Sequence, residues 1–144
     1  MKNKILYIFL FIVFNNIIHF SAKSTEQFNF DVTEIEILEN GNIIKGLKKG
    51  TVKTDDGIKI SANTFVYDKI LNILTADGNV EIIDANKNLK INSENAVYQK
   101  NKEILTTSIN SKATYESGKF IFADNFEFNR SKNILNANGK VKIE

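Results

Sequence analysis

The 144-residue chain contains no cysteine, no proline and no tryptophan, and its one histidine is His19. The lack of cysteine excludes disulfides and a lipid-modified N-terminal cysteine. Beyond His19, the absence of both His and Cys excludes Ser-His-Asp and Cys-His triads and His/Cys metal sites. No low-complexity linker divides the chain. We therefore expect one domain that is stabilised by its hydrophobic core alone.

The N-terminal residues have the pattern of a secretory signal peptide. Two lysines precede an unbroken apolar run over residues 5–14, and a second apolar stretch follows over residues 17–20. An uncleaved membrane anchor is the alternative interpretation. It is less favoured, because two asparagines interrupt an apolar stretch that is shorter than the roughly 20 residues needed to span a bilayer. Export with cleavage is therefore the prediction.

The cleavage site is predicted from the small residues that signal peptidases prefer. Cleavage after Ser24 places Ala22 and Ser24 at the preferred positions, whereas cleavage after Ala22 places the bulky Phe20 in the upstream position. We therefore predict a signal peptide over residues 1–24 and one β-domain over residues 25–144.

Removal of this segment also changes the charge balance. The chain has 19 basic and 17 acidic residues, but Lys2, Lys4 and Lys23 lie in the predicted signal peptide and no acidic residue does. The mature chain is therefore close to neutral, and a nucleic-acid partner is not expected.

Three stretches of the remaining chain are similar to one another and recur at intervals of about thirty residues, which is typical of stacked supersecondary units. They cover residues 60–67, 91–98 and 121–128. A second patterned segment follows each of them at a fixed offset. These segments begin at Leu74, Leu105 and Leu135. The repeating unit is therefore predicted to contain two short strands.

Alternation with a period of two predicts strands throughout, as at Ile58, Ile60 and Ala62, which alternate with polar residues. We expect about nine or ten strands in an antiparallel meander, because the short connections leave no room for crossover helices. The first alternating stretch changes phase between Val32 and Ile35. This predicts a bulge near residues 33–34.

The positions of chain reversals are predicted from dipeptides that tolerate positive φ and from polar clusters. The dipeptides are Asn40-Gly41, Asp56-Gly57, Asp77-Gly78 and Asn138-Gly139, and the clusters cover residues 84–88, 99–102 and 129–133.

When the repeats are aligned, their apolar positions form rows. Plain core packing explains such rows, but a stack of hairpins folded over itself also encloses an elongated apolar trough that is open at both ends. The residues predicted to line it are Ile60, Phe65, Tyr67, Leu74, Val80, Ile91, Tyr98, Leu105, Ile121, Phe126, Phe128 and Leu135.

Two segment pairs carry a resemblance to a known family. Residues 62–67 with 74–80, and residues 123–128 with 135–141, alternate an Ala-Asn/Asp-x-aromatic-x-aromatic strand with Leu-x-Ala-x-Gly-x-Val. This pattern resembles the OstA-like domain, which occurs in the lipopolysaccharide transport proteins LptA and LptC and at the N-terminus of LptD.

The resemblance implies an all-β fold, an open β-jellyroll or β-taco, with no enzyme activity and no cofactor. It implies a periplasmic protein of outer-membrane assembly that holds the acyl chains of lipopolysaccharide or lipid A in the trough. It also implies that further Lpt-type domains, or further copies of this chain, join by strand addition. Exposed sheet edges favour such pairing on physical grounds. We expect Val141 and Ile143 to lie on an assembly edge.

The chain departs from this pattern in its middle repeat. Ile109 stands where the other repeats have Gly78 and Gly139, so we expect a different turn there. Residues 28–39 and 46–54 look most like an LptD N-terminal domain. The sequence leaves open whether the protein is a free-standing LptA-type bridge or part of a longer LptD.

Three other features have competing interpretations. The acidic pairs Asp55-Asp56 and Asp124 with Glu127 fit a catalytic or calcium role less well than turn and repeat positions. Residues 46–50 are expected to form a loop, whose Lys48 and Lys49 are solvated or contact ligand phosphates. The Tyr67 and Tyr98 side chains fit the trough rim and the core equally well.

Two rival functions also remain. A structural or adhesive β-solenoid without a ligand requires an interior that is filled by its own side chains, such as Phe65 and Phe126. A carbohydrate-active β-protein requires two carboxylates in a common cleft.

Overall fold

A computed structural model describes residues 28–115 and 118–144, and in these ranges the chain forms one antiparallel sheet of ten strands. The strands are β1 (Phe28–Leu38), β2 (Ile43–Thr54), β3 (Ile58–Ala62), β4 (Thr64–Asp68), β5 (Ile73–Asp84), β6 (Leu89–Gln99), β7 (Ile104–Tyr115), β8 (Phe120–Asn129), β9 (Ile134–Asn138) and β10 (Lys142–Ile143). Three short 3-10 turns connect some of them: η1 (Glu39–Gly41), η2 (Ala85–Lys87) and η3 (Lys100–Lys102). The predicted antiparallel meander is confirmed. The predicted signal peptide lies outside the described residues.

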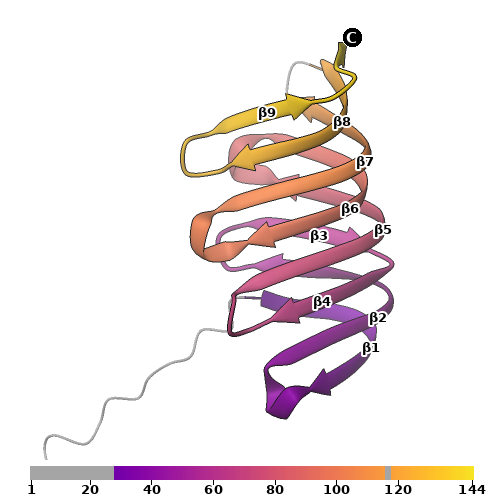
Figure 1. Cartoon of the computed structure of the whole chain (residues 1–144), viewed down its shortest axis with the longest axis vertical. Helices are drawn as coiled ribbons and strands as arrows, with labels where there is room; N and C mark the ends of the chain where they lie inside the picture. The colour runs from indigo at the N-terminus through magenta and orange to yellow at the C-terminus, as the bar shows by residue number, and fades with distance from the viewer. Residues whose placement is uncertain (1–27, 116–117) are drawn as a thin grey trace, which may run out of the picture.

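The sheet is folded along its length into two facing walls (Figure 1). On one wall β4 pairs with one half of β2 and of β5, and on the other wall β3 pairs with the remaining halves of the same strands. At the far end of the sheet, β9 and β10 divide β8 in the same way. We call the two layers the β4 wall and the β3 wall.

The strands cross from one wall to the other on one side of the molecule, which we call the spine. Pairing registers shift there in β1, β5, β6 and β7. The turns of both walls lie on the opposite side, on the left in Figure 1, which we call the mouth. The bulge predicted near residues 33–34 is one of the register shifts at the spine, between Val32 and Glu34.

Two of the four predicted reversals are not reversals. Asn40-Gly41 and Asp56-Gly57 lie at turns, as expected, but Asp77-Gly78 lies inside β5 and Asn138-Gly139 lies between β9 and β10, which both pair with β8. At these two places, positive φ bends a strand from one wall to the other. The same backbone angle serves a hairpin or a bulged bend, so the dipeptide alone does not distinguish them.

The middle repeat keeps the conformation of its neighbours, contrary to the expectation of a different turn. Ile109 has a φ of 67°, beside 76° for Gly78 and 90° for Gly139. The fold therefore imposes the left-handed region at this point even on a β-branched residue.

The predicted loop over residues 46–50 is also wrong, because this segment belongs to β2. Lys48 has a φ of 64° there and lies opposite the irregularity in β1. Gly50 is required at the β1–β2 crossing: a Cβ at this position would lie 2.7 Å from the carbonyl oxygen of Asp31 and from the Cα of Val32. Gly50 thus marks a close approach of two strands within the sheet.

The core lies between the walls and consists of rows of side chains that run across the strands. On the β4 wall one row is Ile37, Ile44, Tyr67, Leu74, Tyr98, Leu105, Phe128 and Leu135. On the β3 wall one row is Val52, Ile60, Ile82, Ile91, Ala113, Ile121 and Ile143. The repeat positions of the sequence therefore become lateral neighbours in the sheet.

Candidate functional site

The structure brings the predicted trough residues together in the core between the walls. All of them belong to the buried core except Ile121 and Leu135, which are partly buried and pack against it. The side chains of Phe65 and Phe126 are each only 1% exposed. In this conformation the protein's own side chains fill the interior. A guest molecule therefore requires the walls to move apart.

At both ends of the described sheet, apolar side chains are exposed. Ile35 and Ile37 on β1 are 49% and 63% exposed, and Val141 and Ile143 are 49% and 68% exposed. Ile37 pairs with Ile44, which packs against the core, and Ile143 pairs with the partly buried Ile121. The inner rows therefore extend to both ends of the sheet, where nothing in the described chain covers them.

The two tyrosines are core residues. Tyr67 is 8% exposed and Tyr98 is 1% exposed, so the rim interpretation does not describe this conformation. The Tyr67 ring contacts Phe28 with a centroid distance of 4.5 Å, and its hydroxyl donates a 3.0 Å hydrogen bond to Asn72. Burial raises the pKa of both tyrosines. Each tyrosine therefore fills the core with its ring while its hydroxyl reaches a polar partner at the mouth.

At the mouth, a cluster of charged side chains joins the two walls. We call it the cross-mouth cluster: Asp55, Asp56, Asp84, Tyr98, Lys100 and Arg130. On the β3 wall, Asp55 and Asp56 belong to the β2–β3 turn and Asp84 is the last residue of β5. The other three residues belong to the ends and turns of the β4 wall. It therefore links segments that are 42 to 74 residues apart in the sequence.

Asp56 lies at the centre of this cluster. Its Oδ2 is 2.5 Å from Lys100 Nζ, 2.8 Å from Arg130 Nη1 and 3.2 Å from the Tyr98 hydroxyl. Lys100 Nζ is also 2.7 Å from Asp55 Oδ1. One carboxylate oxygen thus accepts hydrogen bonds from two cations and a phenol.

Arg130 and Asp84 form the most buried pair of the cluster. Arg130 Nε is 2.6 Å from Asp84 Oδ2, and the two side chains are 6% and 2% exposed. Among the described protein groups, none donates a hydrogen bond to Asp84 Oδ1. A buried ion pair of this kind is costly to break by removing one partner, because the other charge remains in the interior.

The electrostatics of the cluster favour its charged state. Burial by itself raises the pKa of Asp56, but hydrogen bonds from Lys100 and Thr54 and the charge of Arg130 outweigh it and lower the pKa to about 2. Burial by itself lowers the pKa of Lys100 and Arg130, but their carboxylate partners outweigh it and raise both. Asp56, Lys100 and Arg130 are therefore charged at neutral pH.

Sequence reasoning missed this cluster. The turn signals of the sequence cover Asp56, Asp84, Lys100 and Arg130 but indicate no contact among them, and Asp84 is the last residue of β5. One signal was present: Arg130 is the single arginine in a chain whose other basic residues are lysines. Arginine is preferred over lysine where a buried cation must contact two carboxylates.

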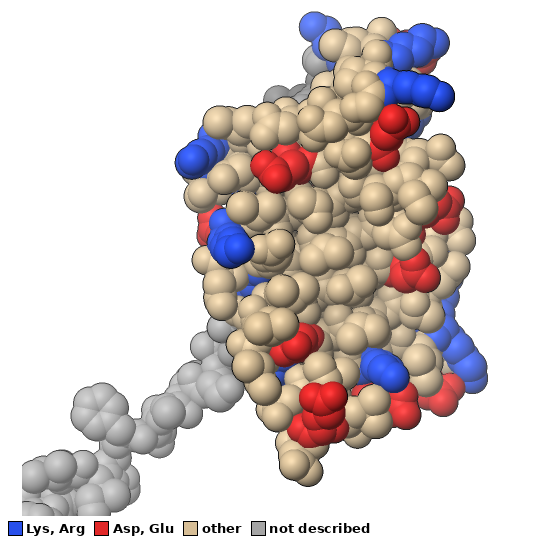
Figure 2. Space-filling view, in the orientation of Figure 1, with Lys and Arg blue, Asp and Glu red and all other residues tan. Residues whose placement is uncertain are grey.

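Several of the charged residues that the sequence offers for a catalytic, metal-binding or phosphate-binding role form ordinary ion pairs. Asp55 and Asp56 both pair with Lys100, and Lys48 pairs with Glu34 at 2.9 Å across β1 and β2. On the face in Figure 2, charged side chains are scattered toward the margins and do not form a basic patch. In the described ranges, no group of three or more acidic or histidine side chains could hold a metal ion.

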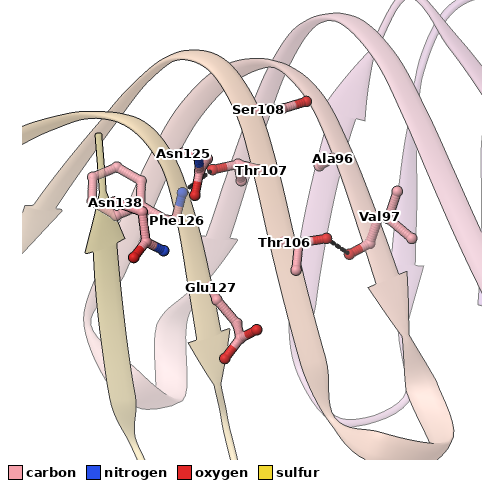
Figure 3. A pocket seen from close by; sticks show the side chains of 9 residues that line it. All are labelled: Ala96, Val97, Thr106, Thr107, Ser108, Asn125, Phe126, Glu127 and Asn138. Atoms are coloured by element: carbon pink, nitrogen blue, oxygen red, sulfur yellow. Dashed lines mark hydrogen bonds between the residues drawn. The ribbon is translucent and has the colours of Figure 1, made fainter. Parts of the chain in front are cut away.

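A hollow of about 320 Å³ lies over β6 to β9 (Figure 3). Val97, Thr106 and Glu127 line it with neighbouring residues of the same strands. Glu127 is the one carboxylate among its lining residues. Asp124 is not among them, and the Lys140 N–H donates a hydrogen bond to it. The hollow therefore lacks the carboxylate pair that glycoside hydrolysis requires.

Comparisons with known proteins bear on the fold. No protein-family model and no curated protein sequence matches the chain. A crystal structure of LptH from Pseudomonas aeruginosa, described as the LptA-homologous periplasmic component of the lipopolysaccharide transport device, is similar with a TM-score of 0.69. The similarity covers 81% of this chain and 93% of LptH at 15% identity. The chain has an LptA-like fold.

No helix in the described ranges is both long enough and apolar enough to cross a membrane.

Proposed function

We propose that the protein is an exported, periplasmic component of lipopolysaccharide transport that takes part in outer-membrane assembly. In this proposal, residues 1–24 are a signal peptide and residues 25–144 are the transport domain. The acyl chains of lipopolysaccharide or lipid A enter between the walls and contact the predicted trough residues, and the sugars remain outside. The similarity to LptH supports the fold on which this proposal rests.

The inner apolar rows that reach both ends of the sheet are the main support for the proposal. Ile37 is 63% exposed and Ile143 is 68% exposed, so neither side chain contributes much to the stability of a monomer. Exposed aliphatic side chains at a sheet edge favour association instead. If another β-jellyroll is added at either edge, the row continues into the neighbour and the exposed side chains are covered. A bridge built in this way has one continuous apolar interior.

The partner at these edges is a second copy or another Lpt-type domain. Both a free-standing LptA-type bridge and an LptD N-terminal domain fit this arrangement. An LptA-type bridge is the simpler form, because one kind of domain then supplies every joint.

A structural β-solenoid without a ligand is the second candidate. It is favoured by one specific observation, the filled interior around Phe65 and Phe126. The two candidates differ in whether the walls separate to admit acyl chains.

Photo-crosslinking distinguishes them. A photoreactive residue is placed at Phe65 or Phe126 in the interior, and a matched control at Lys59, which is exposed on β3. Lipopolysaccharide is expected to crosslink at the two interior positions and not at Lys59. Crosslinks at Lys59 alone would reject the trough, and a complete absence of crosslinks would favour the solenoid.

A further inference from the structure

The contacts within a wall differ in kind from the contacts that join the two walls across the mouth. Within the β4 wall, backbone hydrogen bonds tie neighbouring turns together, as from Lys100 N to Asn72 O at 3.1 Å and from Arg130 N to Glu103 O at 3.0 Å. Across the mouth, every contact of the cluster has a side-chain donor, and the acceptors are side-chain oxygens except for the Asp56 carbonyl, which accepts a 3.3 Å hydrogen bond from Arg130 Nη2. The walls can therefore part at the mouth without breaking a strand ladder.

The ion pairs of the described residues also differ between the walls and the mouth. The ion pairs outside the cluster join neighbouring strands of one wall or residues two positions apart, as Lys90 with Glu81 on β6 and β5. The cross-mouth pairs join the two walls and are more buried, with Lys100 and Arg130 side chains 13% and 6% exposed. Buried ion pairs are often no more stabilising than well-packed apolar residues. Stability alone therefore does not account for charges at this position.

We propose that Lys100 and Arg130 form a concealed anion site, and that a phosphate of an amphiphilic ligand takes the place of the Asp56 carboxylate and releases the β2–β3 turn. This inference rests on the proposed function, because it assigns the step by which a phosphorylated lipid opens the mouth.

The geometry of Asp56 carries this proposal. Its Oδ2 marks a single point that is 2.5 Å from Lys100 Nζ and 2.8 Å from Arg130 Nη1. A phosphate oxygen at that point makes the same two charge-assisted hydrogen bonds, and its further oxygens can reach the Tyr98 hydroxyl. Asp56 lies in a turn and its side chain is already 26% exposed, so water can solvate the released carboxylate, while the ligand replaces the contacts that Lys100 and Arg130 lose.

Release of this turn gives access to the interior. Phe28 pairs with Thr54 immediately before the turn, and its ring lies 4.5 Å from Tyr67 and 6.2 Å from Tyr98. Movement of the turn separates these rings first. The pair formed by Arg130 and Asp84 need not break, so it tethers the walls farther along the mouth.

The test measures the width of the mouth in the full chain. Because the sequence contains no cysteine, the double variant Lys53→Cys with Lys102→Cys carries spin labels at those two places only. Both residues are exposed, one on β2 in the β3 wall and the other in η3 of the β4 wall. Distances are measured by pulsed electron paramagnetic resonance with lipid A that carries two phosphates and with the same lipid after enzymatic dephosphorylation. Binding of each lipid is measured separately by co-purification.

The proposal requires the distance to lengthen with phosphorylated lipid A and to remain short with the dephosphorylated lipid. If phosphorylated lipid binds and the distance is unchanged, or if both lipids lengthen it equally, the anion site is wrong while lipid transport stands. If neither lipid binds, the proposed function fails and this inference with it.

Variants separate the anion site from a general loss of stability. Lys100→Gln is expected to lengthen the ligand-free distance and to lower the affinity ratio of phosphorylated to dephosphorylated lipid by roughly tenfold. Lys90→Gln is the matched control, because it removes an ion pair of 2.6 Å within one wall. Arg130→Gln gives the larger effect if it folds. Equal distances and equal affinity ratios in Lys100→Gln and Lys90→Gln would overturn the proposal.

Discussion

Replacing Ile109 with glycine is expected to relieve backbone strain at the spine of the middle repeat. Ile109 has a φ of 67°, and this region is destabilising by about 1–2 kcal/mol for a residue with a Cβ atom. Glycine is not strained there, but its larger loss of backbone entropy on folding destabilises it by about 0.5–1 kcal/mol relative to alanine. The Ile109 side chain is 55% exposed, so its removal sacrifices few contacts.

The comparison that isolates the backbone is Ile109→Gly against Ile109→Ala, because both remove the side chain. We expect the glycine variant to be more stable by about 1 kcal/mol, since relief of strain exceeds the entropy cost. This difference corresponds to about 4 °C in the melting temperature of a domain of this size. Urea denaturation followed by circular dichroism gives both free energies of unfolding.

Val66 provides the control. It lies in the middle of β4 and is 40% exposed. At an extended position the order reverses, so Val66→Ala should be more stable than Val66→Gly by about 0.5–1 kcal/mol. If alanine is also the better residue at position 109, the left-handed conformation of Ile109 is wrong, and with it the equivalence of the three repeats at the spine.

Three further predictions concern the mouth, the β1–β2 crossing and the sheet edge. The pKa of Asp56 is about 2 in the folded chain and 3.8 ordinarily, so the unfolded chain binds more protons between these values and the free energy of unfolding should fall from about pH 4 to pH 2. Asp56→Asn should flatten this part of the pH profile of unfolding, and an unchanged profile would contradict the cross-mouth cluster. Gly50→Ala should destabilise the fold by about 2–3 kcal/mol in urea unfolding, because its Cβ meets the backbone of β1. In Gly41→Ala the Cβ meets open space, so only the positive φ should destabilise the fold, by about 1–2 kcal/mol. Deletion of residues 141–144 should abolish end-to-end association in sedimentation velocity while far-ultraviolet circular dichroism is retained; unchanged oligomers would exclude this edge.

The fold was predictable because its main determinant repeats along the chain. Residues such as Ile60, Ile91 and Ile121 recur at one offset, and period-two alternation assigns them all to one face. Stacking of equivalent units then makes them neighbours in one row, as the pairing confirms. A contact between adjacent repeats can therefore be predicted from the repeat period alone, and the period can be read from a single sequence.

The spine was less predictable because its local signals are ambiguous. Asp77-Gly78 has the composition of a hairpin turn, and only the pairing of β5 on both sides of it shows a bend. Ile109 carries no signal at all, since a β-branched residue argues against the conformation that it adopts. Here the hydrogen bonds of the neighbouring strands override local preference.

The cross-mouth cluster could not be predicted from the repeat. Its contacts depend on how the two walls cross, which brings Arg130 to Asp56 over 74 residues and Lys100 to Asp55 over 45 residues. These separations are not multiples of one repeat, and the partners occupy different positions within their repeats. The single arginine was the one sequence-level sign that a particular pairing was required there.

The distribution of interactions bears on the choice between carrier and solenoid. A solenoid that needs only stability can close its mouth with apolar residues, as the Phe28–Tyr67 contact does at one end. This chain instead places buried ions at the centre of the mouth, where Lys100 and Arg130 converge on one carboxylate oxygen. Ionic contacts at the mouth can be exchanged for those of an anionic group, as the apolar contacts of the interior can be exchanged for those of acyl chains. The filled interior and the ionic mouth are therefore consistent with the closed state of a carrier whose cargo has an anionic head and apolar chains.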